Sequence, residues 1–222
     1  MARVKPSAAI AVLFMLAGCS STGNSNYSQF YQALRQSVTA RFGDGRVTKD
    51  QASAIPYASM GYRVNGAPEQ LVVLATDANG EQLWTSSARI VITTRGGRIT
   101  RTVGLERNIA GLAPRIGEQM PEIAAALKGD LIYARVQDFP SLPAYAVTVN
   151  CTLSRKGAQT IVILGRGIAA IRVDEVCRST NPRWSFTNIY WVDPDTGLCW
   201  RSRQYIDPKG DMIETEILRP PE

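Results

Sequence analysis

The sequence predicts an all-β protein, in which a large antiparallel meander curls into a half-barrel or sandwich with an N-terminal amphipathic helix packed on it. Three observations lead to this class. From residue 55 onward, apolar and β-branched residues recur mainly with period two. Short runs rich in Gly, Asn, Asp and Pro separate these segments at hairpin spacing. Strong helical periodicity precedes the strands and does not alternate with them, so the pattern does not fit repeated β-α units.

The first 26 residues are expected to lie outside this fold. Arg3 and Lys5 precede an apolar run of about 10 residues, which is the length of a signal-peptide core and too short to span a bilayer. The run ends in "LAGC", residues 16–19, which resembles the lipobox of bacterial lipoproteins. We therefore predict a signal peptide over residues 1–18, a lipidated flexible tether over 19–26 and a single β domain over 27–222.

The lipobox resemblance implies that Cys19 carries a thioether-linked diacylglycerol and an N-acyl chain such as palmitate. Two or more acyl chains anchor a protein stably, so the membrane is the first expected partner. Ser20 follows the cysteine, and in the lipoprotein resemblance this residue implies sorting to the outer membrane, on its periplasmic face. An ordinary secretory signal, with Cys19 incidental, is the alternative.

Residues 27–42 are predicted to form the amphipathic helix. Ser25 or Asn26 can cap its start and Gly43 ends it. Few Lys or Arg lie opposite the apolar stripe, so the stripe is expected to pack on the sheet and not in a membrane. Its members at helical spacing are Tyr27, Phe30, Tyr31, Leu34, Val38 and Phe42.

Strands are predicted at residues 55–64, 69–77 and 81–94, and "TTRGGRIT", residues 93–100, predicts a Gly-Gly hairpin. Residues 104–130 are irregular, with a short helix at 120–128. Further strands are predicted at 130–138, 145–154, 159–164, 169–177, 185–193, 198–205 and 212–218. The segments "RKGA", "GRG" and "DPDTG" are predicted turns. Ten or eleven strands in one meander should curl, because large open sheets rarely stay flat.

Composition excludes several functions. The sequence contains no histidine, which rules out Ser-His-Asp and Cys-His catalysis and every His-containing metal site. No C-x-x-C pair occurs, so we expect no metal site and no cofactor. The formal charge of +6 falls to +4 when Arg3 and Lys5 leave with the signal peptide. The remaining basic residues are scattered singly, so nucleic acid is not an expected partner.

Three cysteines remain beside Cys19. An oxidising periplasm would permit one disulfide, and we favour Cys151–Cys177 because each lies on or at the end of a predicted strand. Cys199 would then be the leftover thiol. Three buried free cysteines are the alternative.

The C-terminal segment "NIYWVDPDTGLCWRSRQYIDPKGDMIETEILRPP", residues 188–221, resembles the signature of the YjbF/GfcB family, the group 4 capsule polysaccharide lipoproteins. "LWTSSARIVITTRGGRITRTVGL" and "YASM" also fit that family. The resemblance implies an all-β outer-membrane lipoprotein encoded among genes for capsule or exopolysaccharide production and export, with no known catalytic residue. The matching residues are Asn188, Tyr190, Trp191, Asp193, Gly197, Trp200, Ser202, Gln204, Pro208, Leu218 and Pro220.

The predicted function is therefore a non-enzymatic accessory lipoprotein of polysaccharide secretion. Its expected partners are glycan and the polysaccharide export proteins. Trp84, Trp200, Arg201 and Arg203 are candidate contacts, because aromatic rings stack on sugar rings and arginine donates to hydroxyls; core packing is the competing interpretation for any single ring. Two other classes stay open: an acyl-chain carrier, which needs a dry apolar pocket, and a glycan hydrolase, which needs two carboxylates in one cleft.

Overall fold

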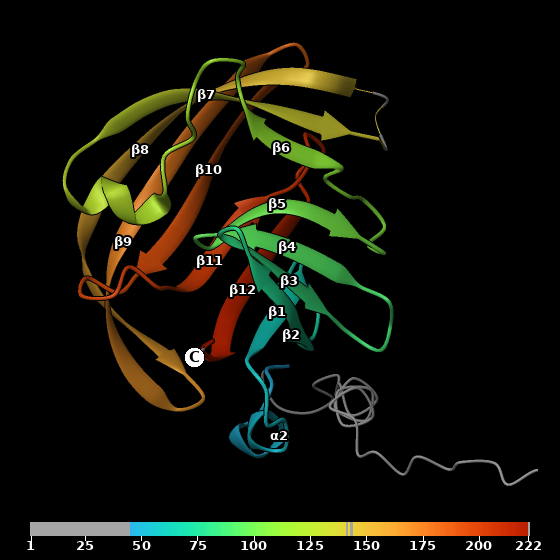
Figure 1. Cartoon of the computed structure of the whole chain (residues 1–222), viewed down its shortest axis with the longest axis vertical. Helices are drawn as coiled ribbons and strands as arrows, with labels where there is room; N and C mark the ends of the chain where they lie inside the picture. Colours follow the sequence, from blue (N-terminus) through green and yellow to red (C-terminus); the bar gives the residue numbers. More distant parts are fainter. Residues whose placement is uncertain (1–44, 141, 143, 222) are drawn as a thin grey trace, which may run out of the picture.

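The fold is all-β, as the sequence predicts. The computed structural model describes residues 45–140, 142 and 144–221. Twelve antiparallel strands form one sheet that curls into a nearly closed, barrel-like shape (Figure 1). The predicted signal peptide, the tether with Cys19 and the helix predicted over 27–42 lie outside the described residues. Within the described part of the chain, no helix has the length and apolar character needed to cross a membrane.

The elements follow one another in two runs of strands. The first run comprises α2 (Lys49–Ser53), β1 (Ser59–Val64), β2 (Gln70–Ala78), β3 (Glu81–Thr85), β4 (Val91–Arg95) and β5 (Arg98–Val103). The second run comprises β6 (Gly111–Pro114), the 3-10 helix η1 (Ile123–Leu127), β7 (Leu131–Phe139), β8 (Ala144–Ile163), β9 (Arg166–Thr180), β10 (Arg183–Val192), β11 (Cys199–Tyr205) and β12 (Met212–Arg219).

The two runs join through the first and last strands. Spatial order is β5-β4-β3-β2-β1-β12-β11-β10-β9-β8-β7-β6, so each run is a simple meander and β1 pairs with β12. Strands β5 and β6 are the two edges. They approach each other near Thr102, whose amide donates to the carbonyl of Ile109 at 3.0 Å. This contact brings the edges together without a regular ladder between them.

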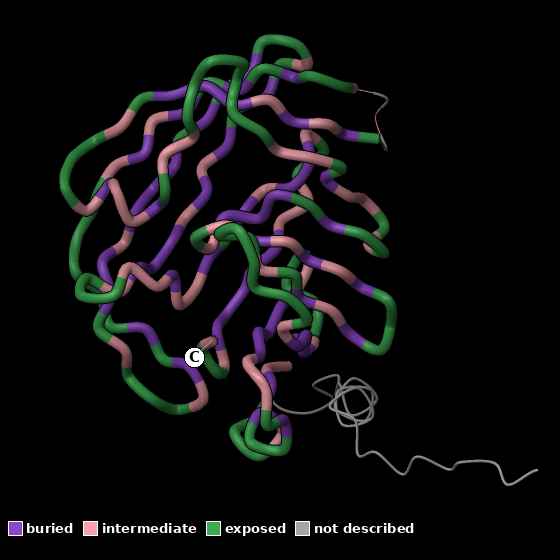
Figure 2. Tube along the Cα trace, in the orientation of Figure 1, coloured by how far each residue is buried: buried purple, intermediate pink, exposed green. Residues whose placement is uncertain are grey.

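Side chains alternate between the inside and the outside of this curled sheet, as strand geometry requires. Figure 2 shows the resulting alternation of buried and more exposed positions along the strands. One apolar cluster lies under β7–β11 and η1, and includes Phe139, Val149 and Phe186. Another lies under β1–β5 and β12, and includes Trp84 and Ile213. The core is therefore divided between the two runs of strands.

Helix α2 covers the outer face of β2. Its start carries a capping box, in which Thr48 accepts from the amide of Gln51 and the Gln51 side chain accepts from the amide of Thr48. Ala52 on the helix packs against Leu71 and Val73, which point outward from β2. This short helix was not predicted from the sequence.

Several predicted boundaries were wrong. The strands predicted at 145–154 and 159–164 are one long strand, β8, which ends at Ile163. The segment "RKGA" is a register shift inside this strand and not a turn. Residues 81–94 form two strands, β3 and β4. Strand β6 lies in the stretch predicted to be irregular. The short helix predicted over 120–128 is present as η1, in 3-10 form.

The predicted Gly-Gly hairpin is confirmed, and its tip packs across the interior. Gly96 and Gly97 connect β4 to β5 with φ angles of +53° and +84°, which the tight hairpin requires and glycine adopts without strain. A side chain at Gly97 would collide with Cβ of Cys199 on β11. The tip of one meander therefore contacts the other meander directly.

Gly97→Ala should lower the free energy of unfolding by about 1–3 kcal/mol, because it combines a left-handed backbone with the collision at Cys199. Gly66→Ala is the matched control, since Gly66 has φ +74° but open space where an alanine Cβ would lie. Urea denaturation of both variants separates the two effects. Equal losses would show that the tip does not pack as tightly as the structure indicates.

Candidate functional site

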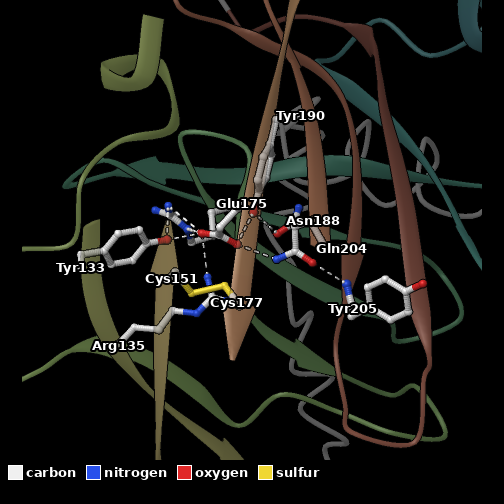
Figure 3. The surroundings of a disulfide bond; sticks show 10 residues. Tyr133, Arg135, Cys151, Glu175, Cys177, Asn188, Tyr190, Gln204 and Tyr205 are labelled. Atoms are coloured by element: carbon white, nitrogen blue, oxygen red, sulfur yellow. Dashed lines mark hydrogen bonds and ion pairs between the residues drawn. A yellow bond between two sulfur atoms is a disulfide. The ribbon is translucent and has the colours of Figure 1, made fainter. Parts of the chain in front are cut away.

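A cluster of polar and charged side chains occupies the middle of the barrel, between the two apolar clusters. We call it the buried polar centre, and Figure 3 shows most of it around the disulfide. At its middle is Glu175 on β9, whose side chain is fully buried. Its members are Arg98, Tyr133, Arg135, Glu175, Asn188, Tyr190 and Gln204.

Two arginines neutralise the Glu175 carboxylate. Arg98 donates to Oε1 from Nε at 3.1 Å and from Nη2 at 3.0 Å, and Arg135 donates from Nη1 at 2.9 Å. Tyr133 also donates to Oε1, while Asn188 donates to Oε2 at 2.6 Å. Both oxygens of the carboxylate are therefore satisfied, as a buried charge requires.

Burial alone would raise the pKa of Glu175, but the charges of Arg135 and Arg98 outweigh it. Together with the hydrogen bonds from Tyr133 and Asn188, they lower the pKa to about 2. Glu175 is thus an ionised carboxylate at neutral pH. Its sealed, fully paired state suits a structural role better than proton transfer.

The buried polar centre also ties the β4–β5 hairpin to the second meander. Arg98 stands just after the hairpin tip and donates to the carbonyl of Pro121 at 2.9 Å as well as to Glu175. Gln204 on β11 accepts from the amide of Ile99 at 2.9 Å and donates to the carbonyl of Gly97 at 2.8 Å. The hairpin tip is therefore fixed by directed polar contacts in addition to packing.

Residues of the C-terminal signature build this centre and the adjoining turn. Asn188, Tyr190 and Gln204 are members of the centre, and the Tyr190 hydroxyl lies 3.2 Å from both Glu175 Oε2 and Gln204 Oε1. Asp193 closes the β10–β11 turn by accepting from the amides of Asp195 and Thr196, each at 3.0 Å. The signature therefore describes the interior of the fold more than its surface.

The disulfide joins Cys151 on β8 to Cys177 on β9, with Cys199 left as a buried free thiol. The two bonded cysteines are direct cross-strand partners, beside Glu175. Although Cys151, Cys177 and Glu175 bring possible ligand atoms together, both sulfurs are committed to the disulfide, so this group does not fit a metal. Burial raises the pKa of Cys199 to about 12, which keeps it a neutral thiol.

A second charged array lies on the outer face of β1, β12 and β11. We call it the outer Arg–Glu ladder. Arg203 donates to Glu214 at 2.6 Å, and Arg201 is ion-paired with Glu216 at 2.7 Å. Arg63 on β1 is also ion-paired with Glu214. Arg46, in the segment before α2, is ion-paired with Glu69, Glu214 and Glu216. The ladder comprises Arg46, Arg63, Glu69, Arg201, Arg203, Glu214 and Glu216.

The tip of the β8–β9 hairpin folds over one side of this ladder. Ile161 and Ile163 pack against Trp191, whose indole donates to Gln159 at 2.7 Å. The guanidinium groups of Arg201 and Arg203 each lie 5.8 Å from the centre of the Trp191 ring, within cation–π range. Trp191 is consequently a buried support for the ladder.

The structure separates the four surface contacts expected from the sequence. Trp84 is fully buried, and its indole donates to Thr94 at 3.0 Å. The expectation that Trp84 is a surface contact is therefore wrong, because it is a core residue. Trp200 is half-buried and donates to Asp193 at 3.2 Å. Arg201 is largely covered, whereas the Arg203 side chain is 44% exposed. The last three lie close together on β11.

Sequence reasoning missed the charged members of the buried polar centre. Arg98, Arg135 and Glu175 come from three different strands, and nothing in the linear order pairs them. One signal was available: Glu175 falls between Val173 and Cys177 at the inward phase of its strand. A charged residue in that phase requires buried partners, although it does not say which ones.

Glu69 gives the ladder a pH dependence. Its carboxylate lies over Gly61, where a side chain could not fit. Burial raises the pKa of Glu69 to about 7, despite the hydrogen bond from the Val47 amide and the charge of Arg46. The pKa of Glu69 in the folded protein exceeds the ordinary value of 4.5. Protonated Glu69 therefore contributes stability that is full below pH 4.5 and is lost as the pH rises through 7.

Glu69→Gln should therefore remove a decline in stability between pH 5 and pH 8. At pH 8 the variant should be more stable than the unmodified protein by on the order of 2 kcal/mol, since it has no carboxylate to ionise. Urea denaturation at both pH values measures the difference. Glu81→Gln is the control, because Glu81 is exposed. A parallel decline in the Glu69 variant would assign the pH effect to another group.

The chain is thus a nearly closed antiparallel β protein with a buried ion network at its centre. The chain belongs to the YjbF family. The family model described as "Group 4 capsule polysaccharide lipoprotein gfcB, YjbF" matches residues 31–218. The chain is thus a member of a lipoprotein family whose name is linked to capsule polysaccharide, which confirms the resemblance found in the sequence.

Relatives from Escherichia coli K12 agree with this assignment. The chain is 29% identical to "Uncharacterized lipoprotein GfcB", over 92% of this chain and 94% of that protein. It is 25% identical to "Uncharacterized lipoprotein YjbF", over 97% and 98%. The crystal structure of the hypothetical lipoprotein YmcC superposes with a TM-score of 0.70 and 28% identity, covering 79% of this chain and 90% of YmcC.

Proposed function

We propose that this chain is a non-enzymatic accessory factor in the production or export of a capsule polysaccharide or exopolysaccharide. In this proposal, acyl chains on Cys19 hold it at the periplasmic face of the outer membrane. The observation that carries the proposal is the family match over residues 31–218. The lipobox at residues 16–19 and the basic, apolar segment before it support the anchor.

The geometry supports a non-enzymatic role. Glu175 is sealed inside the barrel and paired with Arg98 and Arg135. Asp193 and Asp195 shape a turn, in which the Asp193 carboxylate accepts backbone amides. Neither arrangement presents two carboxylates to a sugar across a cleft, as glycoside hydrolysis requires.

The acyl-chain carrier is less well supported. A carrier needs a dry interior lined by apolar side chains. The middle of this barrel is instead occupied by the buried polar centre, whose arginines and carboxylate would face the acyl chain. Trp200, Arg201 and Arg203, all on β11, remain our proposed contacts for glycan or export proteins.

Deletion of the gene, followed by measurement of cell-free extracellular polysaccharide, tests the proposal. We expect a several-fold loss of exported polymer, restored by the unmodified gene but not by Cys19→Ala. Ser20→Ala is the matched control, because it alters the neighbouring residue and keeps the acylation site. Unchanged export in the deletion strain would refute the proposed function, and an unacylated mature protein in mass spectrometry would refute the anchor.

A further inference from the structure

A hollow of about 410 Å³ lies over the outer Arg–Glu ladder, between the segment that leads into α2 and the tip of the β8–β9 hairpin. Figure 1 shows α2, close to where the described chain begins, at the lower end of the molecule. Two acidic residues of the ladder, Glu69 and Glu216, line the hollow, and we call it the Glu69–Glu216 hollow. The other lining residues are Arg46, Val47, Thr48, Lys49, Val162, Leu164 and Gly165.

Each of the two acids keeps one carboxylate oxygen that accepts no hydrogen bond in the described part of the chain. The side chains of Glu69 and Glu216 are only 2% and 3% exposed. Glu69 accepts from the Val47 amide through Oε2, and Glu216 accepts from Arg46 through Oε1. Glu69 Oε1 and Glu216 Oε2 are left over. Such acceptors are uncommon, because a buried polar group without a partner is costly.

The Glu69 carboxylate is also poorly neutralised. The nearest described guanidinium nitrogen, Nη1 of Arg46, lies 3.9 Å from Oε1 and is bonded to Glu216 instead. Burial raises the pKa of Glu69 to about 7, and the charge of Glu216 adds to this effect, whereas the Val47 amide and the charges of Arg46 and Arg63 oppose it. A positively charged donor in the hollow would satisfy both leftover oxygens.

The rim of the hollow combines apolar surface with one ammonium group. Val162, on the hairpin, is 58% exposed. Lys49, at the start of α2, is exposed and has no ion-pair partner among the described residues. A ligand that fits this rim has a positive donor at one end, a negative group that can reach Lys49, and an apolar part that can lie along Val162.

We infer that the Glu69–Glu216 hollow binds a phospholipid headgroup that ends in a primary ammonium, as in phosphatidylethanolamine. An ammonium group has three N–H donors, enough to bond both leftover oxygens through charge-assisted hydrogen bonds. The phosphate would pair with Lys49. A lysine side chain of a partner protein offers the same ammonium but no phosphate. The choice of a lipid rests on the proposed function, since acyl chains on Cys19 would bring this end of the barrel to a lipid surface.

Isothermal titration with soluble short-chain lipids tests the inference. The protein is the mature chain with Cys19→Ala, so that no acyl chain is attached. Dihexanoyl phosphatidylethanolamine should bind at least about tenfold more tightly than dihexanoyl phosphatidylcholine, whose quaternary ammonium has no N–H to donate. Its affinity should rise about tenfold from pH 6 to pH 8, because Glu69 ionises through pH 7 while the ammonium and the phosphate keep their charges.

Variants separate this site from the rest of the ladder. Glu69→Gln should weaken phosphatidylethanolamine binding about tenfold at pH 8 and remove its pH dependence. Glu214→Gln is the matched control, because Glu214 is a buried ladder carboxylate that also pairs with Arg46 but does not line the hollow; it should keep the preference for phosphatidylethanolamine. Lys49→Gln, an exposed substitution with little effect on stability, should weaken binding several-fold and keep the pH dependence.

Absence of binding, equal binding of the two lipids, or equal loss in Glu69→Gln and Glu214→Gln would overturn the inference. Tighter binding of N-acetyl-lysine amide than of the lipid would also overturn it and would assign the hollow to a protein partner. Free ethanolamine that binds as tightly as the lipid would reduce the site to an amine site. Export by the deletion strain is measured independently, so loss of export without any lipid preference would retain the proposed function and remove only this site.

Discussion

Glu175→Gln should lower the free energy of unfolding by about 3–5 kcal/mol, because it leaves two buried arginines without their counter-charge. Arg98 and Arg135 are each 1% exposed and both bind Glu175 Oε1. Glutamine keeps the size of the side chain and removes its charge. Urea denaturation followed by circular dichroism measures the loss, and an undiminished unfolding free energy would contradict the assigned ion network.

A control and a compensated variant make this result specific. Glu118→Gln, in an exposed pair with Arg115, should change stability by no more than about 0.5 kcal/mol. Replacing Glu175, Arg98 and Arg135 together by methionine should recover part of the loss, since apolar substitution of a whole buried ion network is often tolerated. Failure of the triple variant to recover any stability would assign the loss to packing and not to charge.

The same carboxylate predicts how acid acts on the fold. The pKa of Glu175 is lowered from 4.5 to about 2, so its stabilising effect is present above pH 4.5 and is lost as the pH falls through 2. As the pH falls below 4.5, the unmodified protein should lose stability faster than Glu175→Gln. The free energies of unfolding of the two proteins should therefore converge.

The sequence predicts local structure well where a single hairpin determines it. Gly96 and Gly97 require a tight turn, and the alternation on either side requires two strands. The prediction fails where a glycine lies inside a strand. Gly157 and the polar residues around it have the composition of a turn, but they lie where β8 bends beside β9. Pairing with a neighbouring strand overrides the local preference there.

The sequence predicts less of the candidate site. Asn188, Tyr190 and Gln204 belong to a recognisable family signature, yet their shared contact with the buried centre depends on how β9, β10 and β11 lie side by side. Trp84 is a candidate surface ring by composition alone and is buried, because its strand turns that residue inward against Thr94. Register decides such orientations, and a shift of one residue would reverse them.

Cys151→Ala/Cys177→Ala should also destabilise the protein strongly. The disulfide closes a loop with a sequence separation of 26 residues, for which the loop-closure relation gives roughly 3.5 kcal/mol of stabilisation at 25 °C. The cross-link restricts the unfolded chain while the folded strands already lie side by side. Urea denaturation of the double variant should therefore show a lower midpoint with a similar slope or a slightly larger one, because its unfolded chain is less compact.

Reduction tests the same bond without mutation. Dithiothreitol should lower the stability of the unmodified protein by a similar amount and leave the double variant unchanged, which separates loss of the cross-link from loss of the sulfur atoms. Alkylation of the unfolded, unreduced protein should modify Cys199 and spare Cys151 and Cys177. Alkylation of all three cysteines would show that the cross-link is absent. The β8–β9 pair beside Glu175 would then be held by packing and the ion network alone, and Glu175→Gln should become still more damaging.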